Sequence, residues 1–285
     1  MAMLARMAVP TLLERLLFPT AAVDTAALRQ TLAGRTILVT GASFGIGEQV
    51  ARLAGAAGAR VLLVARTTSR LEAIASEIAD AGGTALALSC DLNDADAVDR
   101  LARGLPDLAP DIVVSNAGKS IRRPLLQSLD RFHDVTRTAN INFLSPTRLA
   151  LAAIPGLIER GGQIVNVSAV NVLLQPAPNW AAYQASKTAF DQWLRSAAPE
   201  LRARGVAVTS VYLPLVRTRM IAPTRSYDDV PAMEPEQAAR HIVAAMLTRR
   251  RRWAPWWLPP VQFASSLSRT PWEVLAERRQ RREPR

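Results

Sequence analysis

Between residues 35 and 248 the chain alternates between short, β-branched apolar runs and longer stretches with the period of an α-helix. The short runs predict strands at 36–40, 60–65, 85–88, 111–115, 163–167 and 206–212, and the longer stretches predict helices at 48–57, 70–81, 95–101, 131–157, 181–204 and 235–248. These strands do not alternate between apolar and polar residues, which indicates that both of their faces are buried. The pattern predicts an α/β fold, with a doubly wound, Rossmann-like parallel sheet of about seven strands flanked by helices.

A glycine-rich segment separates the first predicted strand from the first predicted helix. It reads Thr-Gly-Ala-Ser-Phe-Gly-Ile-Gly over residues 40–47. Glycines permit a tight turn and let the backbone approach a pyrophosphate, and the helix N-terminus offers unpaired N–H groups. Because a strand precedes this segment and a helix follows it, we interpret it as a dinucleotide-binding loop. The residues expected to contact the cofactor there are Gly41, Ser43, Phe44, Gly45, Ile46 and Gly47.

The end of the second predicted strand indicates which dinucleotide binds. An acidic residue at this point would favour NAD, because it pairs with the ribose hydroxyls. The chain has Arg66 instead, followed by Arg70, and a guanidinium group pairs well with a 2′-phosphate. We therefore expect NADP(H) as the cofactor. We expect Asp91 and Leu92, which follow the third strand, to lie beside the adenine.

Tyr183 and Lys187 lie one helical turn apart on the same face of a predicted helix. Lys187 is also one of only two lysines in a chain with 35 basic residues. A nearby cation favours the phenolate, so we expect Lys187 to lower the pKa of Tyr183. The tyrosine would then exchange a proton with a carbonyl oxygen while hydride moves to or from the carbonyl carbon.

These motifs make residues 35–250 resemble the short-chain dehydrogenases/reductases. The resemblance depends on residues 40–47, Ser115-Asn116-Ala117-Gly118, Asn142, Ser168 and the pair Tyr183 and Lys187. It implies that Tyr183 is the general acid/base and that Lys187 assists it, while Asn142 holds a proton-relay water. It further implies cofactor contacts at Asn116, Ala117, Gly118, Val216 and Thr218.

The sequence departs from this family after the fifth predicted strand, where a hydroxyl residue usually polarises the carbonyl. Aligning the strand places Ala169 in that position, and Ser168 takes the role only if the backbone shifts by one residue. Loss of such a donor would cost up to a few kcal/mol of transition-state stabilisation. Two interpretations therefore stand: an active NADPH-dependent oxidoreductase that uses Ser168, or a catalytically weakened cofactor-binding partner or regulatory protein.

Three further segments, 118–123, 130–134 and 215–224, resemble bacterial reductases of fatty acyl-CoA and fatty aldehydes. This resemblance implies an acyl or lipid carbonyl substrate: a fatty aldehyde, an acyl-CoA or a 3-oxoacyl compound. Arg122 and Arg123 are then expected to meet coenzyme A phosphates, or alternatively to form a solvated loop. Residues 219–233 are expected to form a lid. The family also implies a homodimer or homotetramer.

Composition divides the chain into an amphipathic extension at 1–33, a dinucleotide-binding catalytic domain at 34–250 and a basic, tryptophan-rich tail at 251–285. The net charge is +11, and residues 249–285 carry seven of these charges. The body is therefore close to neutral, which argues against nucleic acid as a partner. A single cysteine excludes an intramolecular disulfide, and the presence of only two histidines argues against a histidine metal site.

The two ends leave the localisation open. Glu14 and Arg15 interrupt the apolar start, which argues against a cleaved signal peptide, and no run of roughly 20 apolar residues occurs. We expect a cytoplasmic protein. The first helix either packs on the protein or touches the inner membrane surface. The arginines and tryptophans of the tail suit a lipid interface, although they would also suit an edge strand at 252–255 that covers the core.

Overall fold

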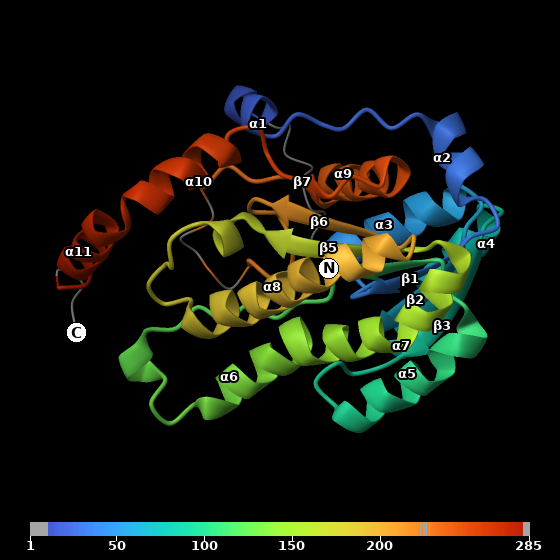
Figure 1. Cartoon of the computed structure of the whole chain (residues 1–285), viewed down its shortest axis with the longest axis horizontal. Coiled ribbons are helices and arrows are strands. Elements are labelled where there is room, and N and C mark those ends of the chain that lie inside the picture. Colours follow the sequence, from blue (N-terminus) through green and yellow to red (C-terminus); the bar gives the residue numbers. More distant parts are fainter. Residues whose placement is uncertain (1–10, 223, 225–226, 228, 282–285) are drawn as a thin grey trace, which may run out of the picture.

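The computed structural model describes residues 11–222, 224, 227 and 229–281, without the side chains of 279 and 280. Seven strands form one parallel sheet in the order β3-β2-β1-β4-β5-β6-β7 (Figure 1). They are β1 (Thr36–Thr40), β2 (Arg60–Ala65), β3 (Thr84–Ser89), β4 (Ile112–Ser115), β5 (Gln163–Ala169), β6 (Ala207–Leu213) and β7 (Arg252–Trp253). The chain order reverses direction between β1 and β4, so this is the doubly wound sheet that the sequence predicts.

Helices cover both faces of the sheet (Figure 1). One face carries α2 (Thr25–Leu32), α3 (Gly45–Ala56), α4 (Thr68–Asp80) and α9 (Pro235–Thr248), and the other carries α5 (Ala95–Leu108), α7 (Ser145–Arg160) and α8 (Ala181–Ala203). Because each strand is covered on both sides, its side chains divide between two apolar clusters. In β1, Ile37 and Val39 belong to the first cluster and Leu38 to the second.

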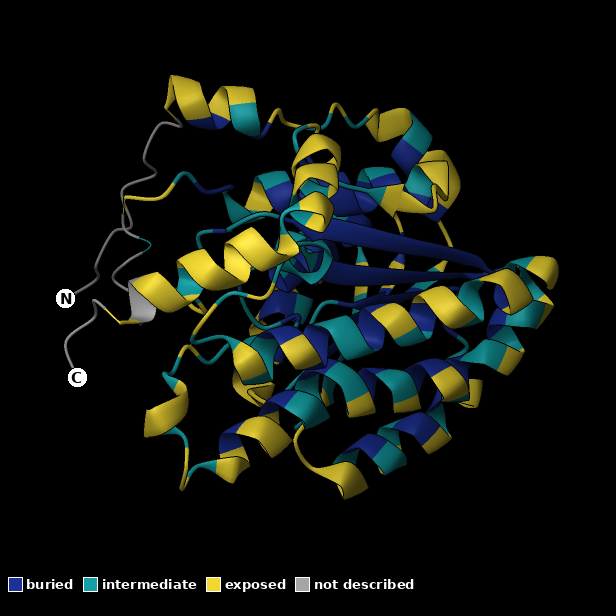
Figure 2. Cartoon of the chain, turned by 60° about the vertical axis from the view of Figure 1, so that its left-hand side comes forward, coloured by how far each residue is buried: buried dark blue, intermediate teal, exposed yellow. Residues whose placement is uncertain are grey.

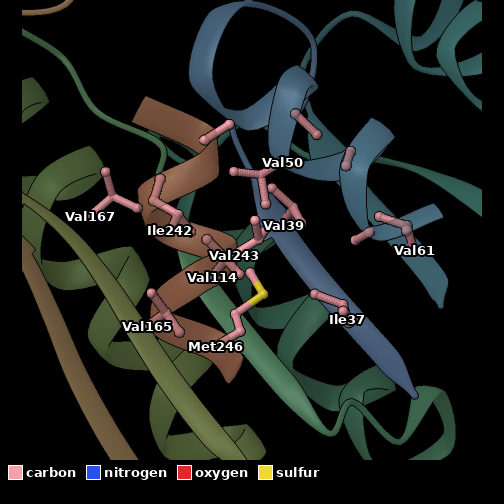
Figure 3. Close-up of a cluster of buried hydrophobic side chains, with 14 of the residues drawn as sticks. Ile37, Val39, Val50, Val61, Val114, Val165, Val167, Ile242, Val243 and Met246 are labelled. Atoms are coloured by element: carbon pink, nitrogen blue, oxygen red, sulfur yellow. The ribbon is translucent and has the colours of Figure 1, made fainter. Parts of the chain in front are cut away.

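Helix α9 fills the centre of the first cluster (Figure 3). Its residues Ile242, Val243 and Met246 are at most 1% exposed and face the valines of the central strands. Burial of three such side chains contributes roughly 5–9 kcal/mol of hydrophobic free energy, before entropy is counted. The same arrangement aligns the carboxyl ends of β1, β4 and β5 at one edge of the sheet, where ligands bind in folds of this kind.

The predicted strands and helices of the body are confirmed, with three differences. Strand β3 is partly exposed because it forms the edge of the sheet and has a neighbour on one side only. The helix predicted at 131–157 begins as α6 (Phe132–Ala139), passes through a π-helical turn at Asn140–Leu144 and continues as α7. Helix α5 is also longer than expected, since it continues through Pro106 to Leu108.

Residues 11–33 pack on the body through two short helices, α1 (Leu12–Leu17) and α2. Leu28 and Leu32 of α2 are 4% and 0% exposed and belong to the main apolar cluster. Periodicity predicts α1 but not α2, whose apolar face has only these two leucines in a polar helix. The contacts make residues 25–32 part of the folded unit and not a free extension.

The first part of the tail is the predicted edge strand that covers the core. Strand β7 closes the sheet as an edge strand, and Trp253 and Trp257 pack against the apolar cluster. Helices α10 (Leu258–Leu267) and α11 (Arg269–Gln280) then run away from the sheet with most of their described residues exposed (Figure 2). Neither α10 nor the start of α11 is evident from periodicity, because two prolines and several serines interrupt the apolar pattern.

Among the described residues, one helical stretch, Phe132–Arg160, is long and apolar enough to cross a membrane by length and composition. It contains α6, the π-helical turn and α7, and it packs against α5 and α8. Its inner residues Leu149, Ala153 and Leu157 lie in the second apolar cluster. In this structure the stretch is a layer of the α/β domain.

The position of Leu32 gives a direct test of where the folded unit begins. Replacing Leu32 by Ala should lower the free energy of unfolding by about 2–5 kcal/mol, because it leaves a cavity in the core. Gln30→Ala, on the exposed side of the same helix, should change it by less than about 0.5 kcal/mol. Urea unfolding of both variants measures the difference. Equal stability of the two variants would mean that α2 is a dispensable extension.

Candidate active site

The glycine loop joins β1 to α3 and adopts backbone conformations that favour glycine. Gly41 and Gly45 have φ angles of +68° and +60°. A Cβ atom on Gly47 would lie 2.3 Å from the carbonyl oxygen of Gly41, so the loop closes too tightly for a side chain there. Phe44, the N-cap of α3, makes no side-chain capping hydrogen bond. The first N–H groups of α3 therefore keep the donor capacity that pyrophosphate oxygens require.

The loop is braced by the end of β4. The Thr40 hydroxyl accepts hydrogen bonds from the backbone N–H groups of Asn116 and Ala117, both at 3.0 Å. The Asn116 carboxamide donates to the Thr40 carbonyl oxygen at 2.9 Å. Two of the residues that resemblance assigns to the cofactor thus hold the glycine loop in place. Their backbone lies at the carboxyl edge of the central strands.

The two arginines expected at the 2′-phosphate have different surroundings. Arg70 donates to the Glu48 carboxylate at 2.7 Å and to the Ser43 carbonyl oxygen at 3.3 Å, so its charge is already paired. The Arg66 side chain is 64% exposed, and its nearest carboxylate, that of Asp91, is 4.0 Å away. Arg66 is therefore free to pair with an added phosphate, whereas Arg70 fixes the glycine loop against α3.

Asp91 and Leu92, the other two residues expected near the adenine, lie in the turn that follows β3. The Asp91 carboxylate accepts from the Asn93 N–H at 2.9 Å and stays partly exposed. Leu92 is 7% exposed and packs in the second apolar cluster, while its carbonyl oxygen accepts from Ser145 Oγ at 2.6 Å. Leu92 therefore anchors this turn, and Asp91 presents its carboxylate next to Arg66.

Asn142 lies in the π-helical turn between α6 and α7 and is 1% exposed. Its carboxamide oxygen accepts from the Lys119 N–H at 2.7 Å, and its nitrogen donates to the Lys119 carbonyl oxygen and to Ser186 Oγ, both at 2.9 Å. The wider π-helical turn interrupts the regular helix at this residue, as such turns often do at functional sites. Asn142 thereby joins the loop after β4 to α8.

Tyr183 and Lys187 face the same site from α8. Lys187 is 9% exposed and its Nζ donates to the Val167 carbonyl oxygen at 3.1 Å. A Cβ atom on Gly118 would lie 3.4 Å from Lys187 Nζ and 3.5 Å from Asn142 Oδ1. The structure therefore brings the end of β4, the π-helical turn and α8 together, as the sequence predicts.

The pKa values of this pair differ from the sequence expectation. Burial raises the pKa of Tyr183 to about 12, with a smaller contribution from Tyr227, and burial lowers the pKa of Lys187 to about 8. The expected lowering of the Tyr183 pKa by Lys187 is wrong for this geometry, because burial removes water from the phenol and disfavours its charged form. At neutral pH the phenol is protonated and can donate a proton.

Ser168, predicted as the substitute for the usual hydroxyl, is sealed away from solvent. It is 4% exposed, and in the described part of the chain its Oγ has no hydrogen-bond partner. It is paired in register with Tyr212 of β6, whose hydroxyl is bonded to Asp191 of α8. Ala169, the last residue of β5, is partly exposed. In this backbone the open position at the strand end belongs to Ala169.

Asn171 is a candidate polar group that sequence reasoning did not identify. It lies in the 3₁₀ turn Val170–Leu173, directly after β5, and its Oδ1 is buried without a hydrogen-bond partner in the described structure. Its carbonyl oxygen accepts from Gln184 Nε2 at 2.6 Å, beside Tyr183. Asn171 lies twelve residues before Tyr183 and two after Ala169, which occupies the usual hydroxyl position. This spacing is the sequence signal that could have identified Asn171 as a candidate.

The segment after β6 that we expect to act as a lid, residues 219–233, has its two ends joined by backbone contacts. Val216 and Met233 form a parallel bridge, and the Arg217 N–H donates to the Met233 carbonyl oxygen at 2.9 Å. Thr218 lies against Gly45 of the glycine loop. Within the lid, the Tyr227 ring stacks on Trp180 at 6.0 Å.

Aromatic rings continue from this segment to Tyr183. Trp180 also meets Tyr183 edge-on, with ring centroids 5.8 Å apart. The neighbouring Arg123 of the predicted phosphate-binding pair is already bonded to Asp134 at 3.0 Å, while Arg122 is exposed. Aromatic rings thus line this side of the site, and of the predicted phosphate-binding pair only Arg122 is without an ion pair among the described residues.

A carboxylate from the N-terminal helix holds both ends of the lid. Glu14 is 7% exposed, its Oε1 accepts from Arg217 and from the Ala232 N–H at 3.1 Å, and its Oε2 caps α1 at Thr11. Although burial opposes it, these hydrogen bonds lower the pKa of Glu14 to about 2. Arg217 also pairs with Glu234 at 3.1 Å. Sequence analysis missed this contact, because the two partners lie 203 residues apart.

A glycine loop on a parallel α/β sheet, with a tyrosine and a lysine facing its carboxyl edge, defines an oxidoreductase that binds a dinucleotide. Comparison with known families agrees: the model of the short chain dehydrogenase family matches residues 35–229. The chain belongs to this family of oxidoreductases.

Two relatives have the same degree of similarity to this chain. A fatty acyl-CoA reductase from Acinetobacter baylyi is 44% identical over 230 residues, which are 80% of this chain and 78% of that protein. A fatty acyl-CoA reductase from Mycobacterium tuberculosis is 44% identical over 227 residues, which are 79% and 77% of the two chains. A solved short-chain dehydrogenase from Sphingobium yanoikuyae, in complex with NADPH, is 28% identical. It covers 86% of this chain and 94% of its own, with a TM-score of 0.71.

The lowered pKa of Lys187 gives a pH test of the site. Lys187 is charged below a pKa of about 8, and Tyr183 stays protonated up to about 12. Carbonyl reduction should therefore be steady below about pH 8 and decline above it, as Lys187 loses its proton. In Lys187→Arg the guanidinium stays charged, so the decline should move up by at least about one pH unit. Lys119→Arg is the matched control, and an identical decline in all three proteins would contradict this role of Lys187.

Proposed function

We propose that this protein is an NADPH-dependent reductase of an acyl or lipid carbonyl, with a fatty acyl-CoA or a fatty aldehyde as substrate. The observation that carries the proposal is the approach of Lys187 and Asn142 to Gly118, where an added Cβ atom would lie 3.4 Å from Lys187 Nζ and 3.5 Å from Asn142 Oδ1. Tyr183, one helical turn before Lys187 on α8, would then be a proton donor near the strand ends where a nicotinamide lies in such folds. The two 44% identical relatives, both fatty acyl-CoA reductases by name, support the choice of substrate.

NADP(H) fits the cofactor side of the site better than NAD(H). Arg66 follows β2 with its side chain 64% exposed, and its only ion pair among the described residues is a loose one with Asp91 at 4.0 Å, so it is available to a 2′-phosphate. The α3 N-terminus and residues 41–47 would hold the pyrophosphate, and Asn116, Ala117, Val216 and Thr218 would lie along the rest of the molecule. The NADPH complex of the similar short-chain dehydrogenase supports the same choice.

The chain's own residues then supply the proton and the positioning. NADPH, when bound, supplies hydride to the carbonyl carbon. Tyr183, protonated at neutral pH, donates its phenolic proton to the carbonyl oxygen. Charged Lys187 stabilises the phenolate that remains, and Asn142 fixes the backbone beside it through Lys119. The Trp180–Tyr227 wall and the lid exclude water from an apolar substrate.

Ala169 favours a second candidate function, a cofactor-binding partner or regulatory protein with weakened catalysis. The missing hydroxyl removes a donor to the carbonyl, and Ser168 faces the protein interior with its Oγ sealed. On the first proposal the Nδ2 group of the Asn171 carboxamide, in the turn directly after β5, supplies the missing donor. On the second, the protein binds NADPH and turns over little.

Restoring the serine distinguishes the two functions. With NADPH and palmitoyl-CoA or a fatty aldehyde, the wild-type protein should oxidise NADPH, and Ala169→Ser should raise kcat by up to about tenfold, because one hydrogen bond to the carbonyl is gained. Tyr183→Phe should abolish turnover while NADPH still binds. The reductase proposal fails if the wild type binds NADPH but shows no turnover until Ala169→Ser is introduced. Asn171→Ala should lower kcat if its carboxamide is the donor, whereas Ser168→Ala should not.

We also propose that this protein binds to the surface of an anionic membrane. Leu12, Leu13 and Leu16 on the outer face of α1 are 86%, 52% and 64% exposed. Trp256, 60% exposed, donates from its indole to the Leu16 carbonyl oxygen at 3.0 Å, so its ring extends the same apolar surface. Figure 2 shows that most of the described residues of α1, α10 and α11 are exposed. An apolar helix face near an arginine-rich tail suits a bilayer with negative headgroups.

Vesicle binding tests this location. Leu12→Ser combined with Leu13→Ser and Leu16→Ser should weaken sedimentation with phosphatidylglycerol vesicles at least about tenfold, because three apolar side chains no longer enter the interface. Leu125→Ser with Leu126→Ser is the control, since those leucines are 72% and 81% exposed elsewhere on the surface. An equal loss of vesicle binding in both variants would show nonspecific hydrophobic binding and would contradict a specific membrane-binding surface on α1.

A further inference from the structure

A pocket outside the active site is lined by four arginines. It has a volume of about 540 Å³ and lies between the C-terminal half of α8, strands β6 and β7, and α10. The arginines are Arg195 and Arg202 on α8, and Arg251 and Arg252 at β7. The two on α8 are separated by seven residues, or two helical turns, so they project from one face of the helix.

The side chains of two of these arginines are held in place by hydrogen bonds. Arg202 donates to the Val208 carbonyl oxygen of β6. Arg252 donates to Gln262 of α10 at 3.1 Å, and its guanidinium lies 5.3 Å from the centre of the Tyr212 ring. The orientation of both groups is therefore set by the protein, as preorganised anion sites require.

The other two arginines have spare donors. Arg251 is exposed, and its side chain makes no hydrogen bond or ion pair within the described residues. Arg195 is 56% exposed, and its nearest carboxylate is that of Asp191 at 3.9 Å. Two fixed and two free guanidinium groups thus face one space, an arrangement that matches the bidentate recognition of phosphate oxygens.

The pocket has more cations than nearby anions. Within the described structure its lining contains no aspartate or glutamate, and the one carboxylate close behind it, Asp191, is 1% exposed and interacts with Arg195 and Arg252. The Asp191 oxygens are already engaged by Asn166 Nδ2 and Ser210 Oγ, each at 3.1 Å, and by Tyr212 OH at 3.0 Å. Burial and the charge of Arg251 both lower the pKa of Arg202, which reflects the cost of holding these cations together. An anion in the pocket would offset that repulsion.

We propose that this pocket is a second ligand site, separate from the dinucleotide cradle, that binds the phosphate group of a small molecule. Its volume lies in the range of small-molecule sites and exceeds what a single phosphate would fill. Leu173 and the Tyr212 ring provide an apolar side for the rest of the ligand. The ligand is either a phosphorylated nucleoside, such as the end of coenzyme A, or a phospholipid headgroup.

The pocket also adjoins the active-site loop. Leu173 ends the 3₁₀ turn that carries Asn171, and the next residues are tied to α10 through Gln175, whose Nε2 donates to the Ser265 carbonyl oxygen at 2.8 Å. Gln262, one turn earlier on α10, lines the pocket. A ligand held by the four arginines would therefore contact both the segment after β5 and the tail.

Calorimetric titration of the full chain, first saturated with NADP⁺, tests the site. Adenosine 3′,5′-bisphosphate and sn-glycerol 1-phosphate are the two probes, representing the nucleotide and the headgroup. One probe should bind with a stoichiometry of one per chain. Arg195→Gln with Arg251→Gln should weaken it at least about tenfold, because two charge-assisted hydrogen bonds are lost. Both side chains lie on the surface, so the variant should keep its melting temperature.

Two controls separate this site from general charge and from the cofactor cradle. Arg204→Gln removes an exposed arginine from the same end of α8 outside the pocket and should leave the affinity unchanged, as should Arg66→Gln. Tighter binding of the bisphosphate would identify a nucleotide ligand, and tighter binding of glycerol phosphate a lipid headgroup. The proposal is overturned if neither probe binds, or if Arg204→Gln weakens binding as much as the double variant does.

Discussion

The active-site side of the molecule depends on the buried carboxamide of Asn142. It accepts from one backbone group of Lys119, donates to another and reaches Ser186 of α8, so a single side chain fixes three elements. A buried amide of this kind is expensive if left unpaired, and here all of these contacts are made. The π-helical turn brings Asn142 into this position. A regular α-helix through residues 132–160 would give the side chains of this turn a different direction about the helix axis.

These hydrogen bonds of Asn142 hold the elements of the candidate active site in fixed positions relative to one another. Lys187 and Gly118 meet because α8 and the end of β4 are both held by Asn142, while Thr40 ties β4 to the glycine loop. Burial raises the pKa of the Tyr183 phenol to about 12, so the group is protonated at neutral pH. In the proposed reaction this arrangement suits a tyrosine that gives its proton away, with Lys187 stabilising the phenolate that remains.

Much of the fold could be predicted from the sequence, because buried parallel strands carry their own apolar signature and the glycine loop marks one strand–helix junction. The pair Tyr183 and Lys187 follows from helical spacing alone. The direction of the Tyr183 pKa shift could not be predicted, since it depends on how completely the ring is buried. The sealed hydroxyl of Ser168 depends on its strand register, and the four-arginine pocket joins residues from α8, β7 and α10. Contacts of these kinds leave no local pattern.

The contact of Glu14 with both ends of the lid has a practical consequence. Glu14 fastens Arg217 and Ala232, which lie at the two ends of the segment after β6, to the N-terminal helix α1. A purification tag or fusion partner that disturbs α1 would therefore disturb this segment as well, whereas one that follows the exposed helix α11 would not. Kinetic constants measured with the two kinds of tagged protein should therefore be compared before either is taken as those of the native chain.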